Sequence, residues 1–282
     1  MNAALPGLLP GLVRIACTAG AAIMQVYGTA FAVQTKDDHS PLTEADLAAH
    51  RLIERELAAL TPDIPQLSEE SDPAAITGRR GWPRLWLIDP LDGTREFVNR
   101  NGEFTVNIAL VEHGRATFSV VHVPARDACY AASLDASAPG AWRILAGGAP
   151  APIRCRRWPG AGTGEEVIVA GSRRHGVERL EALLAHLGPH RLISAGSALK
   201  FCLVAEGAAD LYPRFGPTSE WDTAAGQCLV EAAGGAVLAL DGRPLRYNLR
   251  DTLRNAEFFA ASDAAQAVRL LPFATPAPRT TP

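Results

Sequence analysis

The amino-acid sequence predicts a protein with an α+β arrangement in its first half and an α/β arrangement in its second half. Between residues 85 and 145, short apolar or alternating segments of strand length follow one another, as in an antiparallel sheet with helices on one side. Beyond residue 166, strand-like and helix-like segments alternate, which is typical of an α/β layer. Between them, residues 147–164 are rich in Gly, Pro, Ala and Arg, which predicts domains over 1–150 and 151–282.

Composition limits the classes of protein that this chain can represent. A chain of 282 residues is long enough for two packed domains, and 48% apolar with 20% charged residues is ordinary for a soluble globular protein. The net charge of −3 argues against a surface for nucleic acid polymers, but it does not exclude a small anionic substrate. The five cysteines are scattered and form no Cys-x-x-Cys motif. This pattern fits a reducing cytoplasm and argues against a disulfide scaffold or a thiolate zinc site.

The N-terminal region is rich in alanine and leucine, so a leader or membrane segment must be considered. No basic segment precedes the apolar stretch, and Pro6, Pro10, Arg14 and Gln25 interrupt it, which argues against a signal peptide or a transmembrane helix. We expect an amphipathic helix over about residues 10–27.

A second helix is predicted to begin after Thr43. Thr43 is a suitable N-cap, and Glu44 and Asp46 supply the negative charge that a first helical turn favours. The position of Asp46 is also that of a capping-box acid, which is a sufficient structural explanation for it. The buried face of this helix is given by Ala49, Ile53, Leu57 and Leu60.

The remaining elements follow from apolar periodicity. Strands are expected at 85–88, 104–111, 117–123, 129–132, 142–145, 167–170, 191–194, 209–215 and 236–240. Helices are expected near 177–187, 198–206 and 223–233, and the tail from Pro272 is expected to be frayed.

The segment Asp-Pro-Leu-Asp-Gly-Thr at 89–94 follows a strand-like apolar run. Carboxylates of Asp89 and Asp92 placed about 4 Å apart would repel by roughly 4 kcal/mol at an effective dielectric constant near 20, unless a cation lies between them. Gly93 permits a tight turn, in which the amides of Gly93 and Thr94 face an anion. The residues alone are equally compatible with a strand that ends in an ordinary Asp-Gly turn.

Four further acidic residues each have an ordinary explanation. Asp46 suits a helix cap, Glu69 and Glu70 suit a solvated loop, and Asp222 suits an N-cap. Their combination is more specific, because Ser-Glu-Glu at 68–70, Asp-Pro-Leu-Asp-Gly-Thr at 89–94 and Trp-Asp-x-x-Ala-Gly at 221–226 resemble the ordered motifs of the inositol monophosphatase superfamily. Within that superfamily, the stretches 101–110, 199–207 and 212–218 resemble the bacterial 3′(2′),5′-bisphosphate nucleotidases, and the resemblance extends to about residue 250.

The resemblance implies a layered αβαβα sandwich and an enzyme that uses two or three Mg²⁺ ions. Hard cations of this kind take oxygen ligands and retain waters. The implied ligands are Glu69, Asp89, the Leu91 carbonyl, Asp92 and Asp222. Asp89 would bridge two ions, with one of them activating a water for in-line attack. Thr94, paired with Asp46, would orient that water and accept its proton, and the Gly93 and Thr94 amides would bind the phosphate.

The substrate is implied by a second group of residues. In related bisphosphate nucleotidases, the positions of His175, Ser197, Lys200 and Arg214 contact the nucleotide and its 5′-phosphate, and Glu69 and Asp222 are also expected to contact substrate. Inositol phosphatases tend to carry an acid in place of Arg214, and a base there favours a second phosphate. The alternative for Lys200 and Arg214 is a solvated helix face and a strand end.

The function implied is hydrolysis of the 3′-phosphate of 3′-phosphoadenosine 5′-phosphate to AMP and phosphate, in support of sulfur assimilation and with sensitivity to Li⁺. We expect a cytoplasmic monomer or homodimer with a small nucleotide substrate, and peripheral association with the inner membrane stays open. Competing functions on the same scaffold are an inositol or fructose-bisphosphate phosphatase and a non-catalytic nucleotide sensor.

Two unrelated phosphatase and hydrolase classes fit the sequence poorly. An aspartyl-phosphate mechanism of the haloacid dehalogenase type needs Asp-x-Asp-Gly-Thr, whereas Asp89 and Asp92 are three residues apart. A zinc hydrolase needs histidines at ligand spacing, and Gly188-Pro189 between His186 and His190 prevents a helical ligand pair.

Overall fold

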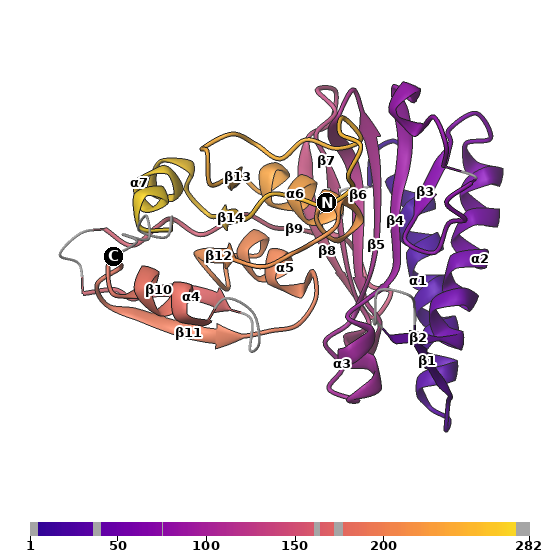
Figure 1. The fold of residues 1–282 in the computed structure, drawn as a ribbon, viewed down its shortest axis with the longest axis horizontal. Coiled ribbons are helices and arrows are strands. Elements are labelled where there is room, and N and C mark those ends of the chain that lie inside the picture. Colours follow the sequence, from indigo (N-terminus) through magenta and orange to yellow (C-terminus); the bar gives the residue numbers. More distant parts are fainter. Residues whose placement is uncertain (1–4, 36–40, 75, 161–163, 172–176, 275–282) are drawn as a thin grey trace, which may run out of the picture.

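The computed structural model describes residues 5–35, 41–74, 76–160, 164–171 and 177–274. Helices and sheets alternate in five layers, with a larger sheet formed by the first half of the chain and a smaller sheet formed by the second half (Figure 1). A pair of helices lies between the two sheets, and further helices cover the outer face of each sheet (Figure 1). This architecture confirms the layered αβαβα sandwich that the family resemblance implies. The division into domains at residue 150 stays a prediction.

The larger sheet has the strand order β3-β4-β5-β6-β7-β8-β9 and carries the first acidic motifs. Its strands are β3 (Gln66–Ser68), β4 (Arg84–Asp92), β5 (Thr105–Glu112), β6 (Arg115–Val123), β7 (Ala128–Ser133), β8 (Gly140–Leu145) and β9 (Ala151–Pro152). All neighbours pair antiparallel except β3 and β4, which are parallel. The parallel pair places the residues that follow β3 beside the end of β4.

Helices α1 (Leu9–Tyr27) and α2 (Glu44–Leu60) cover one face of the larger sheet. Between them in the chain lies a hairpin of β1 (Val33–Thr35) and β2 (Pro41–Thr43). By length and composition alone, α1 qualifies as a candidate membrane span, but an apolar core helix meets the same criteria. Its face of Leu9, Leu12, Ile15, Ala16, Ala19 and Ile23 is buried against the sheet, which supports the predicted amphipathic helix.

The opposite face of the larger sheet is covered by α5 (Leu199–Ala205) and α6 (Glu220–Ala232), which belong to the second half of the chain. The expectation of helices on one side only is therefore wrong. The strands are apolar on both faces, and only elements distant in sequence were available to cover the second face. The short helix α3 (Thr94–Val98) follows β4 directly.

The smaller sheet has the order β11-β10-β12-β14-β13. Its strands are β10 (Val167–Gly171), β11 (His190–Ser194), β12 (Leu211–Arg214), β13 (Ala236–Ala239) and β14 (Phe258–Ala261). Helices α4 (Val177–Leu184) and α7 (Ala264–Ala274) pack on its outer face. The sequence pattern did not predict β14 or α7. The prediction of a frayed tail from Pro272 is wrong for residues 272–274, because they belong to α7.

The close approach of α5 and α6 generates a prediction about stability. A Cβ added at Gly226 would overlap the ring of Phe201, so Gly226→Ala forces the helices or the ring apart. We expect this variant to lose about 1–3 kcal/mol in the free energy of unfolding, as overpacked cores do. Urea denaturation followed by circular dichroism measures the change.

The matched control is Gly81→Ala, because an added Cβ there meets nothing within 4 Å and the backbone has no positive φ. Its free energy of unfolding is expected to stay within about 0.5 kcal/mol of the wild-type value. Equal losses in the two variants would contradict the packing argument.

Candidate active site

The acidic motif at the end of β4 is shaped by a β-bulge. Strand β4 does not end before the carboxylates, as the sequence pattern suggested, but continues through Asp92. Asp89 pairs with Asn107 and Asp92 pairs with Thr105, so three steps along β4 oppose two steps along β5. The extra residue bends the strand and turns its side chains, as bulges beside active sites often do. The Asp89 side chain is buried and accepts a hydrogen bond from the Leu91 amide at 3.1 Å.

Gly93 makes the turn that follows, with φ of +90°. A Cβ at this position would lie 3.2 Å from the carbonyl oxygen of Glu103 and 3.2 Å from Cβ of Ser197. The left-handed conformation and the close neighbours both require glycine here. The turn brings Thr94 to the first position of α3.

The predicted pair of Asp46 and Thr94 is present in the structure. The Thr94 hydroxyl lies 3.2 Å from Oδ1 of Asp46 and 3.3 Å from the Leu91 carbonyl oxygen. The other carboxylate oxygen of Asp46, Oδ2, accepts hydrogen bonds from the Thr43 amide at 2.7 Å and the Thr43 hydroxyl at 2.6 Å. Asp46 is therefore both the capping-box acid of α2 and the hydrogen-bond partner of Thr94, while its role in accepting a proton stays a prediction.

Asp222 has the same double position in α6. Ser219 is the N-cap, and its amide donates to Oδ2 of Asp222 at 2.9 Å, so Asp222 is the capping-box acid rather than the N-cap that its motif suggested. The Glu69 amide donates to the Ile88 carbonyl at 3.1 Å, which places Glu69 directly after β3 and beside the end of β4. Glu70 follows in the turn after β3.

Electrostatics show that these acids form one cluster. Burial raises the pKa of Asp89 well above its usual range, and the negative charges of Glu69, Asp92, Asp222 and Asp46 raise it further. Burial, with the charge of Asp92 as the next cause, raises the pKa of Asp222 to about 8. Buried carboxylates that repel one another are characteristic of a site for a hard divalent cation, which prefers oxygen ligands. The residues present therefore fit the implied Mg²⁺ site.

Asp92 is held by residues from both halves of the chain. Its Oδ2 accepts hydrogen bonds from the Ser197 hydroxyl at 2.7 Å and the Ala198 amide at 2.7 Å. The Asn107 amide group lies 3.4 Å from the same oxygen, and the Thr105 and Ser197 hydroxyls are 2.6 Å apart. Ser197, which the resemblance assigns to the nucleotide, thus contacts an expected metal ligand.

Lys200 is buried, which rules out the solvated helix face considered for it. Its ammonium group donates to the carbonyl oxygens of Ser197 at 2.7 Å and Ala195 at 3.2 Å and lies 5.0 Å from the centre of the Tyr212 ring. Burial lowers the pKa of Lys200 to about 8; Asp92 opposes this shift and the positive charge of Arg214 adds to it. Arg214, at the end of β12, donates to the carbonyl oxygens of Gly216 and Pro217.

A cavity of about 170 Å³ joins the acidic and basic groups. Asp92, Gly93 and Asp222 line it together with Ser197, Lys200 and Arg214. The structure thus brings together residues from both predicted sets, whereas His175 lies outside the described residues. Thr105, Asn107 and Tyr212 were not assigned from the sequence. Polar Thr105 and Asn107 at alternate positions of an otherwise apolar strand were the available signal for the first two.

Comparisons with known proteins agree on one family. The Inositol monophosphatase family profile matches residues 8–272. The 3′(2′),5′-bisphosphate nucleotidase CysQ of Escherichia coli K12 is 47% identical over 254 residues, which cover 89% of this chain and 98% of that protein. The crystal structure of CysQ from Bacteroides thetaiotaomicron has a TM-score of 0.74 and 39% identity, over 89% of this chain and 96% of that one. An IMPase/NADP phosphatase complexed with Mg²⁺ and phosphate, at 21% identity, shares the fold with a TM-score of 0.71 over 92% of each chain.

The repulsion within the acidic cluster predicts that Mg²⁺ stabilises the protein. At one hundred times its Kd, Mg²⁺ is expected to add about 2.7 kcal/mol to the free energy of unfolding, and EDTA to remove this gain. Asp222→Asn removes one charge but keeps an oxygen for the Ser219 amide. We expect this variant to be no less stable than wild type without metal and to gain much less from Mg²⁺, as measured by thermal denaturation.

Asp63→Asn is the control, because Asp63 is an exposed acid in the turn between α2 and β3. It is expected to show the full wild-type gain from Mg²⁺. If Asp222→Asn showed the same full gain, Asp222 would not belong to the cation site.

Proposed function

The chain belongs to the inositol monophosphatase family, and we propose that it is a 3′(2′),5′-bisphosphate nucleotidase that removes the 3′-phosphate of 3′-phosphoadenosine 5′-phosphate, giving AMP and inorganic phosphate. Members of this family are metal-dependent phosphatases that act on small phosphorylated molecules. The observation that carries the proposal is the single cavity in which the acidic cluster at Asp92 and Asp222 faces the buried cation Lys200 and Arg214. A substrate with two phosphates matches this separation of charge.

We propose two or three Mg²⁺ ions as the cofactor. The carboxylates of Glu69, Asp89, Asp92 and Asp222, with the Leu91 carbonyl, would hold them, because this set offers only oxygen. When bound, such cations neutralise phosphate charge and lower the pKa of water. Removal of the Asp92 carboxylate therefore removes a ligand on which turnover depends.

Thr94 and Asp46 are proposed to position the attacking water. The Thr94 hydroxyl can donate its proton toward Oδ1 of Asp46, which leaves an oxygen lone pair to accept a hydrogen from water. Asp46 can then take up the proton that the water loses as it attacks, through the Thr94 hydroxyl. Oδ2 of Asp46 is fixed by Thr43, so the acceptor is held in place before substrate binds. The amides of Gly93 and Thr94, at the turn into α3, would hold the phosphate under attack.

The second phosphate is proposed to bind between Lys200 and Arg214. Two of the three ammonium hydrogens of Lys200 are engaged by backbone carbonyls, which leaves one for a ligand. The charge of Arg214 already disfavours the charged form of Lys200, so an anion between them relieves a repulsion that exists in the free protein. Ser197 and His175 stay proposed nucleotide contacts, and Glu69 and Asp222 stay proposed substrate contacts.

The cellular setting is part of the proposal and rests on similarity to the CysQ proteins. We propose a cytoplasmic enzyme, active as a monomer or homodimer, that is inhibited by Li⁺ and supports sulfur assimilation. Peripheral association with the inner membrane would be tested by fractionation.

A substrate panel tests the proposed activity. With Mg²⁺, release of inorganic phosphate is expected to be much faster from 3′-phosphoadenosine 5′-phosphate than from inositol 1-phosphate or fructose 1,6-bisphosphate. Asp92→Asn is the control and is expected to abolish turnover while keeping the fold. Faster release from inositol 1-phosphate would assign the chain to the inositol phosphatases, and binding of the nucleotide without phosphate release would assign it to a sensor.

Charge removal at Lys200 tests the substrate assignment. Lys200→Met keeps the apolar side-chain stem inside the core, and we expect KM for the bisphosphate to rise about 10–100-fold, because a charged hydrogen bond contributes about 1.5–3 kcal/mol. Hydrolysis of inositol 1-phosphate, which has no second phosphate, is expected to change much less. The exposed Arg191→Gln variant is the control and should keep wild-type kinetics. If Lys200→Met kept the wild-type preference for the bisphosphate over inositol 1-phosphate, the proposed binding site for the second phosphate would be wrong.

A further inference from the structure

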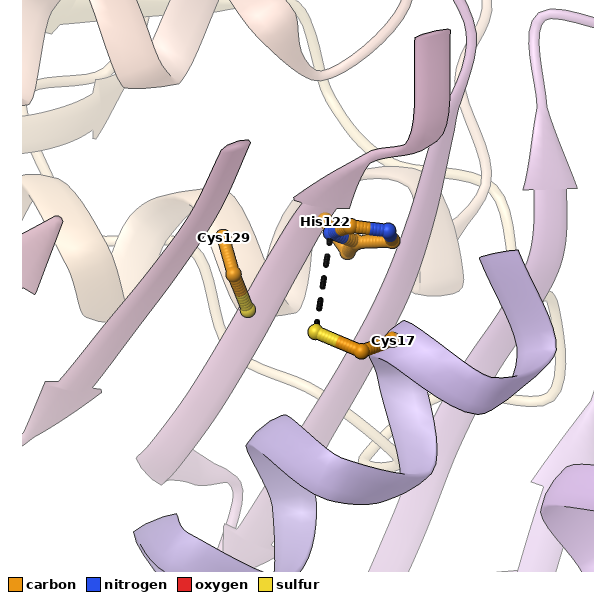
Figure 2. Close-up of side chains that lie close together, drawn as sticks. All are labelled: Cys17, His122 and Cys129. Carbon is orange, nitrogen blue, oxygen red and sulfur yellow. Dashed lines mark hydrogen bonds between the residues drawn. The ribbon is translucent and has the colours of Figure 1, made fainter. Parts of the chain in front are cut away.

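Two thiols and an imidazole meet on the face of the larger sheet that α1 covers, opposite the face covered by α5 and α6 (Figure 2). His122 on β6 and Cys129 on β7 are directly paired across the two antiparallel strands. Their neighbours at alternate positions, Val120 and Ala131, belong to the apolar core beneath α1. Because side chains alternate between the faces of a strand, His122 and Cys129 both point toward α1.

Cys17 completes the group from α1. Its Sγ lies 4.0 Å from Nδ1 of His122 (Figure 2). One turn further along the helix, Gly20 leaves space for the imidazole, since an added Cβ would overlap Cδ2 of the ring and lie 2.5 Å from Nε2. The ring therefore rests with its Nε2 side on the helix backbone, while Nδ1 faces the thiol. Gly20 on α1 and the pairing of His122 with Cys129 therefore hold the three side chains close together in the protein without a ligand.

The imidazole is buried with little hydrogen bonding. His122 is 3% exposed, and within the described residues the only hydrogen-bond partner of its ring is the weakly polar sulfur of Cys17. Buried polar groups in native proteins almost always have a good partner. The Cys17 thiol and an imidazole nitrogen thus face each other without a strong hydrogen bond between them.

We propose that Cys17, His122 and Cys129 form a binding site for a Zn²⁺ ion. All three ligand atoms lie within 4.8 Å of one another. Tetrahedral zinc with Zn–S near 2.3 Å and Zn–N near 2.0–2.1 Å requires separations of about 3.6–3.8 Å between ligand atoms. Each sulfur therefore needs to move by about 1 Å or less, which is within reach of small side-chain rotations. Cys17 is partly buried, whereas His122 and Cys129 are buried.

The donor set separates this site from the acidic cluster. Thiolate and imidazole ligands select borderline-soft ions such as Zn²⁺, whereas Mg²⁺ needs oxygen ligands. The site joins α1 to β6 and β7, and none of its three residues lines the substrate cavity. We therefore assign the ion a structural role: it fixes α1 on the sheet. His122 on β6 also pairs with Val106 on β5, which lies between Thr105 and Asn107. The ion would therefore hold β6, the strand next to the one whose residue Asn107 contacts Asp92.

Cobalt substitution tests the site in the full-length protein. The reduced protein, freed of metal and handled without oxygen, is titrated with Co²⁺ in the presence of excess Mg²⁺ to occupy the acidic cluster. We expect one equivalent of Co²⁺ to produce a sulfur-to-metal charge-transfer absorption and tetrahedral ligand-field bands, both displaced by one equivalent of Zn²⁺. In excess Mg²⁺ and without Co²⁺, added Zn²⁺ is also expected to raise the Tm of the protein.

Variants locate the ligands. Cys17→Ser and Cys129→Ser are each expected to reduce the charge-transfer absorption to half or less and to weaken Zn²⁺ binding at least tenfold. Cys155→Ser, at a partly buried cysteine outside the cluster, and Asp92→Asn, in the acidic cluster, are the controls that keep both signals. The wild-type titration needs no variant, so it decides even if a substitution impairs folding. Absence of the sulfur-to-metal band in wild type, or its persistence at full wild-type intensity in both Cys17→Ser and Cys129→Ser, would overturn the site.

Discussion

Buried carboxylates that repel one another are the main constraint on this molecule. Asp89 and Asp222 both have pKa values raised by burial and by neighbouring acids, so the folded protein gathers negative charge where water is scarce. The fold offsets this cost locally. Asp46 and Asp222 each use one oxygen to accept the amide at the start of a helix, so the positive ends of the α2 and α6 dipoles lie at the cluster. Asp92 is held by a serine hydroxyl and an amide from the second half of the chain. These contacts form together at one end of β4 because the β-bulge lies between Asp89 and Asp92.

The parts of the site that could be predicted from the sequence are those that are local in the chain. Asp89, Asp92 and Gly93 lie close together in the chain, and their spacing fitted a cation and phosphate site as well as it fitted an ordinary Asp-Gly turn. Glu69 and Asp222 approach that turn only through strand pairing and helix packing, so residue patterns gave no reason to join them and the family resemblance was needed. The burial of Lys200 was also not predictable, because a lysine on a short helix usually faces solvent. The ring of Tyr212, on the next strand β12, lies over the Lys200 ammonium group, and this tertiary contact is not visible in the helical pattern.

The same limit applies to the fold and to the cysteines. Helices α5 and α6 were predicted as elements, but their place on the second face of the larger sheet follows from tertiary packing. Cysteine spacing argued against a thiolate zinc site, since rules of that kind detect ligands close in sequence. Cys17 and Cys129 are brought together only by the docking of α1 and the register of β6 with β7. Register therefore creates ligand sets that no linear motif describes.

The Asp46 carboxylate contacts both the start of α2 and Thr94, and this has a consequence for how the protein responds to heating. One oxygen of Asp46 caps the start of α2 and the other accepts a hydrogen bond from the Thr94 hydroxyl, so the helix cap and the proposed proton acceptor are one group. Helix ends are the segments that open most readily in native proteins. Fraying of a single turn at Thr43 would withdraw the acceptor while both sheets and their cores remain intact. Heating would thus inactivate the enzyme through local and reversible unfolding of the first turn of α2, well below the temperature at which the whole chain unfolds.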